Sequence, residues 1–338
     1  MVIICSSSSS GSTLLSNLLN RHPLIASGEE LGFFSKPIFY DDFSRLKRLS
    51  FLIRRYGISS NPYFDDRSIL RNLDSYGLNT RIGWKWVKAS STIQELSSKF
   101  ERYILESTEK KIWVEKTPEN IYLLKKFLSA FPQAMVLHIV RDPRDVVLSL
   151  MKRGFSFEYA GDIWLSSVAA IQPFRSNKNI LEIRYEDLII KHESILQKIC
   201  SFFNIPFNKS FFVEDKYVSK GILRSKGFDS WGADPSQPIS LNSVDKFKQL
   251  PKDFFSRLYH MKLTKTFADI LGCAEFNIQD LMNRYGYDVP EQIPPLTNLT
   301  ARATRQNLKQ KRGIAETLKQ FFITRYIETE TPIKRVMI

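Results

Sequence analysis

The sequence predicts an α/β protein built on a P-loop-type parallel β-sheet flanked by helices, with a mostly helical insertion over the active-site edge. Two observations lead to this prediction. Short apolar runs alternate with helical stretches along much of the chain, an order typical of parallel sheets with helices on both faces. A loop of small residues also connects the first apolar run to a helix, and this layout presents backbone N–H groups to a phosphate.

Five apolar runs are the expected strands. Continuous apolar character, without alternation, suits strands that are buried on both faces, as the strands of parallel sheets are. Four of the runs are clear, and the fifth, at residues 24–26, is weaker. The clear runs cover residues 2–5, 112–114, 135–140 and 180–183.

Helical patterns fill several of the segments between these strands. Pro143 stands in the first turn of one expected helix, where proline is tolerated because that turn needs no backbone N–H donor. The expected helices cover residues 12–20, 118–131, 143–153 and about 194–203.

Two segments break the alternation, and a basic extension follows the expected domain. Residues 32–100 carry Phe, Tyr and Leu at helical spacing, and we expect them to form the helical insertion. Residues 215–242 are rich in Gly, Ser, Pro and Lys without periodicity, which predicts a long mobile loop. Residues 1–290 are expected to form one domain, followed by a basic C-terminal extension at residues 291–338. A helix in that extension is expected to pack on its own domain, and a partner or membrane surface is the alternative.

The composition is that of a globular protein, since 43% of the 338 residues are hydrophobic and 25% are charged. The formal net charge of +14 favours anionic partners, which include nucleic acids, membrane surfaces and phosphorylated small molecules. No apolar run approaches the roughly 20 residues that span a bilayer, so no transmembrane segment is expected. The start of the chain lacks the features of a secretory signal, and three cysteines without CxxC spacing argue against disulfides and zinc. These features predict a reducing, cytoplasmic location and leave a homodimer open.

The first candidate site is the serine loop, residues 6–13, between the first strand and the first helix. Its backbone N–H groups, its hydroxyls and the following helix N-terminus all favour a phosphate. Nucleotide triphosphatases carry GxxxxGK[ST] here, whereas Gly11 is followed by Ser12 in place of the lysine, which argues against an ATPase or GTPase. The candidate ligand-binding residues of the loop are Ser8, Ser9, Ser10, Gly11, Ser12 and Thr13.

A second set of polar residues follows the strand expected at residues 135–140. Arg141 stands at the carboxyl end of this strand, the edge where ligands bind in open α/β sheets. Ser149 and Arg153 are four residues apart on the following helix and therefore share a face. Two guanidinium groups and a hydroxyl suit a second anion pocket. Arg144 and Asp145 are instead expected to form a local ion pair at the helix start.

Together these motifs resemble the PAPS-dependent sulfotransferases, in particular their bacterial and tyrosylprotein-sulfotransferase branch. The resemblance covers about residues 1–290 and begins with the serine loop paired with Val140-Arg141-Asp142-Pro143-Arg144. Further motifs in the order of that family are His22-Pro23, Gly28-Glu29-Glu30, Glu115-Lys116-Thr117-Pro118, Arg184-Tyr185-Glu186-Asp187-Leu188, and Pro238-Ile239 leading to Ser243 and Lys246.

The resemblance implies 3′-phosphoadenosine 5′-phosphosulfate (PAPS) as the sulfate donor, without a metal ion. It implies that the serine loop holds the 5′-phosphosulfate end, and that Arg141 and Ser149 hold the 3′-phosphate. The cofactor-binding residues then also include Tyr185, Ser243 and Lys246.

One loop position departs from the family pattern. The family usually carries Arg or Lys immediately before Ser-Gly-[ST]-T, and this chain has Ser9 there. In the family, that basic residue normally contacts the 5′-phosphosulfate. Without it, the serine loop has less positive charge to neutralise its ligand. Lys116 is expected to supply the missing charge, because the corresponding lysine of the tyrosylprotein branch faces the transferred sulfate.

Sulfuryl transfer also needs a base, because the acceptor hydroxyl or amine must lose a proton. The resembling branch places its catalytic glutamate at the second carboxylate of Gly-Glu-Glu, which implies Glu30 as the base, beside Lys116 as the second catalytic residue. Glu29 is then expected to orient a loop or to bind a basic residue. His22 is a rival base, but its position before Pro23 in a helix-to-strand turn favours a structural role.

The expected function is sulfuryl transfer from PAPS to an acceptor, with the product adenosine 3′,5′-bisphosphate (PAP) left behind. The acceptor is expected to be a small metabolite, and peptidyl tyrosine is the alternative. A small-molecule kinase is a second alternative, which the missing loop lysine disfavours. A basic nucleic-acid-binding protein is a third, and the chain lacks the motifs of that class, so no nucleic-acid partner is expected.

Overall fold

The computed structural model describes residues 1–32, 34–44, 46–47, 72–212 and 243–293. The expected mobile loop at residues 215–242 lies outside the described residues. The same holds for the expected tail helix and for residues 48–71 of the insertion.

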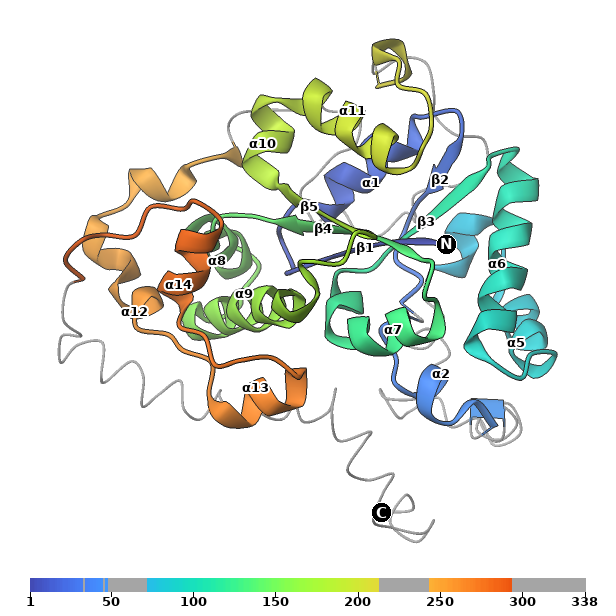
Figure 1. The fold of residues 1–338 in the computed structure, drawn as a ribbon, viewed down its shortest axis with the longest axis horizontal. Helices are drawn as coiled ribbons and strands as arrows, with labels where there is room; N and C mark the ends of the chain where they lie inside the picture. Colours follow the sequence, from blue (N-terminus) through green and yellow to red (C-terminus); the bar gives the residue numbers. More distant parts are fainter. Residues whose placement is uncertain (33, 45, 48–71, 213–242, 294–338) are drawn as a thin grey trace, which may run out of the picture.

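A five-stranded, all-parallel sheet forms the centre of the molecule (Figure 1). All five expected strands are confirmed. They are β1 (Val2–Ser6), β2 (Ile25–Ser27), β3 (Ile112–Lys116), β4 (Met135–Val140) and β5 (Ile180–Arg184), in the spatial order β2-β3-β1-β4-β5. Because the strands are parallel, their carboxyl ends lie at one edge of the sheet, where the segments following β1, β3, β4 and β5 begin.

Helices cover both faces of the sheet, as expected. Alternate residues of a strand point to opposite faces, and β1 shows this clearly: Val2 and Ile4 pack in one apolar cluster, Ile3 and Cys5 in another. The first cluster includes residues of α1 (Ser12–Asn20), α10 (Tyr185–Ile190) and α11 (His192–Phe202), which lie together above the sheet in Figure 1. The second includes residues of α7 (Leu124–Ala130) and the end of α9 (Phe157–Ile171), below the sheet.

A third cluster joins α8 (Pro143–Met151) and α9 to the C-terminal helices. These are α12 (Ser256–Tyr259), α13 (Lys265–Leu271) and α14 (Ile278–Arg284), reached through the short 3-10 helices η7 (Lys246–Gln249) and η8 (Lys252–Phe255). Two further 3-10 helices are η3 (Gln172–Phe174) before β5 and η4 (Lys209–Phe212) after α11.

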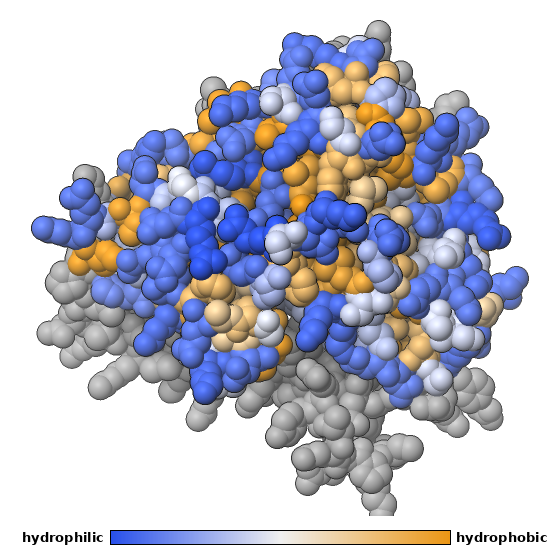
Figure 2. All heavy atoms as spheres, in the orientation of Figure 1, coloured by the Kyte–Doolittle hydropathy of each residue, from blue (hydrophilic) through white to orange (hydrophobic). Residues whose placement is uncertain are grey.

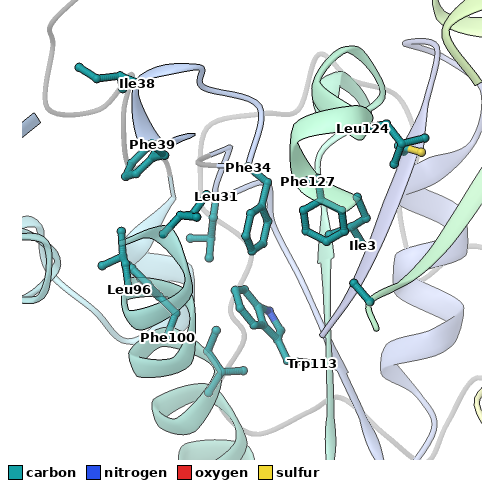
Figure 3. Packing of buried hydrophobic residues seen from close by; sticks show 14 of the residues in the cluster. Ile3, Leu31, Phe34, Ile38, Phe39, Leu96, Phe100, Trp113, Leu124 and Phe127 are labelled. Carbon is teal, nitrogen blue, oxygen red and sulfur yellow. The ribbon is translucent and has the colours of Figure 1, made fainter. Parts of the chain in front are cut away.

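The described part of the insertion is helical, in agreement with the prediction. It contains α2 (Ile38–Asp41), the 3-10 helix η1 (Leu73–Tyr76), α5 (Thr80–Lys88) and α6 (Ile93–Thr108), which extends past the expected end at residue 100. Helix α6 packs beside β2 and β3. Figure 3 shows the aromatic packing that joins this region to the sheet, with the Phe34 ring between Phe127 and Trp113.

One helix prediction needs correction, and one helix was not predicted. Residues 118–131 are not one helix, because a 3-10 turn, η2 (Pro118–Leu123), precedes α7. The side-chain amide of Asn120 donates to Glu115 at the end of β3, and this bond holds the turn against the strand. Helix α9 had no predicted counterpart, because it is apolar on most sides and lacks the one-sided periodicity of a surface helix.

No helix among the described residues is long and apolar enough to cross a membrane. Figure 2 shows one face of the molecule, which hydrophilic residues cover for the most part, with smaller hydrophobic areas between them.

Candidate active site

The serine loop connects β1 to α1 at the carboxyl edge of the sheet. Gly11 precedes α1 with a φ of 94°, in the left-handed region that favours glycine. A Cβ atom at Gly11 would collide with the ring of Tyr185 at the start of α10. The glycine is therefore required both by its backbone conformation and by the close approach of an aromatic ring.

Arg141 joins the serine loop to residues far away in the sequence. Its guanidinium donates to the backbone carbonyl of Ser9 at 3.1 Å and to the backbone carbonyl of Ser243. It also stacks 4.5 Å from the ring centroid of Tyr185, whose hydroxyl donates to Ser243 Oγ at 2.6 Å. The structure thus brings together four predicted cofactor-binding residues from four separate segments.

Two residues that the sequence did not single out as ligands hold Arg141. The carboxylate of Asp145 lies 3.6 Å from its guanidinium, and the indole N–H of Trp164 donates to its backbone carbonyl at 2.7 Å. Asp145 also accepts the backbone N–H of Phe247 at 3.0 Å, which fixes the start of η7. Trp164 lies on α9, so no local pattern could have predicted this contact.

Arg153 approaches the same loop from another side. Its Nη1 donates to the hydroxyl of Ser9 at 2.8 Å. Burial lowers the pKa of Arg153, and the negative charges of Glu30 and Glu119 oppose that shift. Ser149 is half-buried on α8, but this helix ends at Met151, so Arg153 lies in the turn beyond it and not on the helix face that the sequence predicted.

Lys246 begins η7 near this cluster. Burial lowers its pKa, and the positive charges of Arg141 and Lys152 lower it further, while the negative charge of Asp145 opposes them. Positive charge therefore accumulates around Arg141, and a bound anion would relieve it. Lys152 was not among the predicted site residues.

The local ion pair expected between Arg144 and Asp145 is not formed. Arg144 instead makes two hydrogen bonds with the Asp142 carboxylate, at 2.9 and 2.6 Å, while Asp145 faces Arg141. Asp142 is also the N-cap of α8, accepting the backbone N–H of Arg144. Asp142 and Arg144 can pair although they are only two residues apart, because Asp142 lies outside the helix.

The predicted base and the predicted catalytic lysine are in direct contact. Lys116, at the end of β3, lies 3.0 Å from the Glu30 carboxylate and 3.4 Å from the hydroxyl of Thr13 in the serine loop. Lys116 is 3% exposed and Glu30 28% exposed, so the lysine sits inside the site and the carboxylate near its opening. This arrangement joins the Gly-Glu-Glu segment to the loop.

The Gly-Glu-Glu segment is held by its backbone. The side-chain amide of Asn72 donates to the Glu30 carbonyl at 2.9 Å, and the hydroxyl of Tyr76 donates to the Glu29 carbonyl at 2.6 Å. Both donors belong to the insertion, so this part of it reaches the carboxyl edge as expected, whereas α6 packs beside β2 and β3. Sequence reasoning missed both residues, because neither lies in a motif.

Glu115 stabilises the other end of that segment. It is fully buried and accepts hydrogen bonds from the backbone N–H of Gly32 and from the side chains of Thr117 and Asn120. Burial raises its pKa, although these three hydrogen bonds oppose the shift. Glu115 therefore supports the loop that carries Glu30.

His22 has the structural role that its sequence position favoured. Its ring is buried, its Nδ1 accepts the backbone N–H of Leu24 at 3.1 Å, and its Nε2 lies 3.0 Å from the carbonyl of Pro206. Burial lowers its pKa. Since both ring nitrogens are engaged with backbone groups, His22 is not placed to take a proton from an acceptor.

Within the part of the chain that the structure describes, no group of three or more His, Cys, Asp or Glu side chains could hold a metal ion. The arrangement instead offers backbone N–H groups, hydroxyls and cations at one edge of a parallel sheet. This donor set suits a phosphorylated nucleotide.

Comparisons with known proteins identify the family and the fold. A family model described as "Sulfotransferase family" matches residues 2–209. No curated protein matches the sequence.

Two solved structures share the fold. The sulfotransferase domain of the olefin synthase from Synechococcus PCC 7002 has a TM-score of 0.57 and 22% identity, with 86% of this chain and 95% of that chain covered. The sulfotransferase domain from the curacin biosynthetic pathway has a TM-score of 0.56 and 19% identity, with 86% and 98% covered. At these identities the likeness concerns the fold.

Proposed function

Since this chain belongs to the sulfotransferase family, we propose that it transfers a sulfuryl group from PAPS to a hydroxyl or amine of a small acceptor. The family and the fold support sulfotransferase activity; the donor, the acceptor class and the residue roles below are our proposal. The acceptor is proposed to be a small metabolite.

The observation that best supports PAPS as the donor is the convergence on Ser9. Its carbonyl accepts from Arg141 and its hydroxyl accepts from Arg153, while Tyr185 covers Gly11 two residues later. Two arginines and a loop rich in N–H and O–H donors suit a ligand with two separate phosphate groups, and the Tyr185 ring offers a flat apolar surface beside them. These residues would hold PAPS, which supplies the activated sulfuryl group.

The proposed chemistry uses the Lys116–Glu30 pair. The acceptor oxygen or nitrogen bonds to sulfur as the bond from sulfur to the 5′-phosphate oxygen breaks, and Glu30 takes the acceptor's proton. Lys116 lies between Glu30 and the loop residue Thr13, where its charge stabilises the negative charge that develops on the leaving phosphate. As in phosphoryl transfer, positioning and electrostatic stabilisation would supply most of the rate.

Isothermal titration calorimetry with PAP, ATP and a DNA duplex tests the donor assignment. We expect the protein to bind PAP and to bind neither ATP nor DNA with comparable affinity. Binding of ATP without binding of PAP would instead favour a kinase. Sulfate transfer from PAPS to a panel of hydroxylated and amine-bearing metabolites then tests the acceptor class.

A further inference from the structure

The serine loop carries no charged residue of its own. Residues 6–13 read Ser-Ser-Ser-Ser-Ser-Gly-Ser-Thr, so hydroxyls and backbone N–H groups are the only donors that it brings to an anion. A phosphosulfate group gains additional negative charge on its phosphate as the sulfuryl group leaves, and neutral donors alone stabilise such charge less than a cation does. The loop therefore needs a positive charge from another element.

Arg153 is held at the loop by the end of α8. The chain reverses after this helix at Gly154, which has a φ of 88°, and the backbone N–H groups of Gly154 and Phe155 donate to Met151 and Leu150. This closing turn directs Arg153 back toward Ser9, whose hydroxyl it contacts at 2.8 Å. The Phe155 ring, stacked on Tyr159, lies 5.9 Å from the guanidinium.

Arg153 and Arg141 reach Ser9 at different atoms and have different neighbours. Arg141 contacts the Ser9 carbonyl, Tyr185 and Ser243, and its charge acts on Lys246. The charge on Arg153 is instead influenced by Glu30 and Glu119, on the side of the site that carries the Lys116–Glu30 pair. Ser9, with a φ of 65°, lies between the two arginines.

We propose that Arg153 supplies a second positive charge to the serine loop, beside that of Lys116, and that it binds the 5′-phosphosulfate side of the nucleotide rather than the 3′-phosphate pocket of Arg141. This inference rests on the proposed function. It divides the second anion cluster of the sequence in two: Arg141 with Ser149 and Lys246 on the 3′ side, and Arg153 with Lys116 on the 5′ side. A cation from the turn after α8 thus takes the place of a basic residue in the loop.

Displacement of PAP by adenosine 5′-monophosphate and by adenosine 3′-monophosphate distinguishes the two sides. We expect Arg153→Ala to weaken the 5′-monophosphate by about tenfold or more, the effect of losing one charge-assisted contact, and to leave the 3′-monophosphate within about twofold. Arg141→Ala should show the opposite pattern. Arg81→Ala, which removes the same charge from an exposed position on α5, is the matched control.

A rescue experiment tests the charge itself. We expect Ser9→Lys in the Arg153→Ala background to restore PAP affinity and sulfuryl transfer to within about tenfold of wild type, because the charge then comes from the loop. The same Ser9→Lys substitution should not rescue Arg141→Ala. Arg153→Lys, which keeps the charge, and thermal unfolding of each variant separate loss of the contact from loss of the fold.

The outcomes separate this inference from the proposed function. If the wild-type protein fails to bind PAP, the proposed function is wrong and Arg153 has no nucleotide to contact. If the wild-type protein binds PAP but Arg153→Ala weakens the 3′-monophosphate and spares the 5′-monophosphate, the division of the two arginines is wrong. Failure of Ser9→Lys to rescue a folded Arg153→Ala protein would also overturn it.

Discussion

Glu30 is the proposed base: its carboxylate contacts Lys116, its side chain is partly exposed, and Asn72 holds its backbone carbonyl. We expect Glu30→Gln to lower the rate of sulfuryl transfer by about 10²- to 10⁴-fold, because an amide keeps the shape but cannot accept the proton. Steady-state kinetics with PAPS and the acceptor measures this change. The PAP affinity should stay close to wild type, because Glu30 is an acidic group that contacts Lys116 and does not itself bind a phosphate.

Lys116→Ala should be compared with Glu30→Gln, because the two variants are expected to slow turnover for different reasons. Both should slow turnover, but acceptors of lower pKa should partly rescue Glu30→Gln only, since they need less help to lose a proton. Wild-type turnover by Glu30→Gln would make the base assignment wrong and would direct attention to Glu29. His22 would not be the next candidate, because backbone groups occupy both of its ring nitrogens.

An added methyl group at Gly11 of the serine loop would meet both a steric and a backbone obstacle. Gly11→Ala places a Cβ atom against the Tyr185 ring and keeps a left-handed backbone that alanine disfavours. We expect the ring to shift and the PAP affinity to fall by about tenfold or more, measured by calorimetry. Gly272→Ala is the matched control, since Gly272 also has a positive φ, of 67°, but no atom lies within 4 Å of the added Cβ.

The double variant of Gly11→Ala with Tyr185→Ala separates the two causes. If the collision dominates, removing the ring should cancel most of the added loss, so that the double variant binds PAP about as well as Tyr185→Ala alone. If backbone strain dominates, the two effects should add.

Helix η1 contacts the segment that carries the proposed base, and Tyr76 makes one of these contacts. The buried Tyr76 hydroxyl is bonded to the Glu29 carbonyl, so Tyr76→Phe leaves that carbonyl without its donor at a cost of about 1–3 kcal/mol. We expect kcat to fall severalfold while PAP affinity stays unchanged, because the support reaches Glu30 and not the arginines. Kinetics combined with PAP calorimetry measures both quantities.

Tyr40→Phe is the matched control for that variant. The Tyr40 hydroxyl also donates to a backbone carbonyl, that of Phe34, at 2.9 Å, but it does not contact the Gly-Glu-Glu segment. Tyr40→Phe should lower the stability of the protein without lowering kcat as Tyr76→Phe does. Equal effects of the two substitutions on kcat would show that Tyr76 contributes to stability only.

At the level of the whole molecule, a cluster of polar side chains joins the last described helix to the edge of the sheet. The carboxylate of Glu182, on β5, bonds to His138 on β4, to Tyr285 after α14 and to Arg175. Burial raises the pKa of Glu182, but these hydrogen bonds and the charge on His138 outweigh it and lower the pKa from 4.5 to about 2. The charged carboxylate is therefore stabilised by folding.

This shift predicts how stability depends on pH. Because the pKa of Glu182 is lower in the folded protein than in the unfolded chain, its contribution is fully present above about pH 5 and is lost as the pH falls toward 2. The contribution is on the order of 3 kcal/mol. Chemical unfolding of wild type and Glu182→Gln between pH 2 and 7 should show two curves that converge in acid.

Glu106→Gln, an exposed carboxylate on α6, is the control and should follow the wild-type curve throughout. A constant difference between wild type and Glu182→Gln down to pH 2 would mean that the carboxylate keeps an ordinary pKa in the folded protein.

The strands and the loop were predictable from short stretches of sequence. Apolar runs of three to six residues mark all five strands. Strands β1 to β4 are buried along almost their whole length, and the edge strand β5 is half-buried but keeps an apolar run. The serine loop and Arg141 were predictable for a related reason: strand ends in a parallel sheet meet at one edge, so residues that follow two strands become neighbours.

Other features depend on how distant segments pack, and no local pattern contains them. Helix α9 is buried among other helices, so it lacks the polar face that reveals a helix in a sequence. The contacts of Tyr76 with Glu29, and of Trp164 with Arg141, cross 47 and 23 residues. The pairing of Arg144 with Asp142, and the approach of Arg153 to Ser9, follow from side-chain directions at the two ends of α8. Composition and order along the chain thus establish the sheet and the edge where ligands bind, because burial and strand direction leave a local signature. Which partner each charged side chain contacts at that edge is decided only by the tertiary structure, because an electrostatic partner is the oppositely charged group that lies nearest in space.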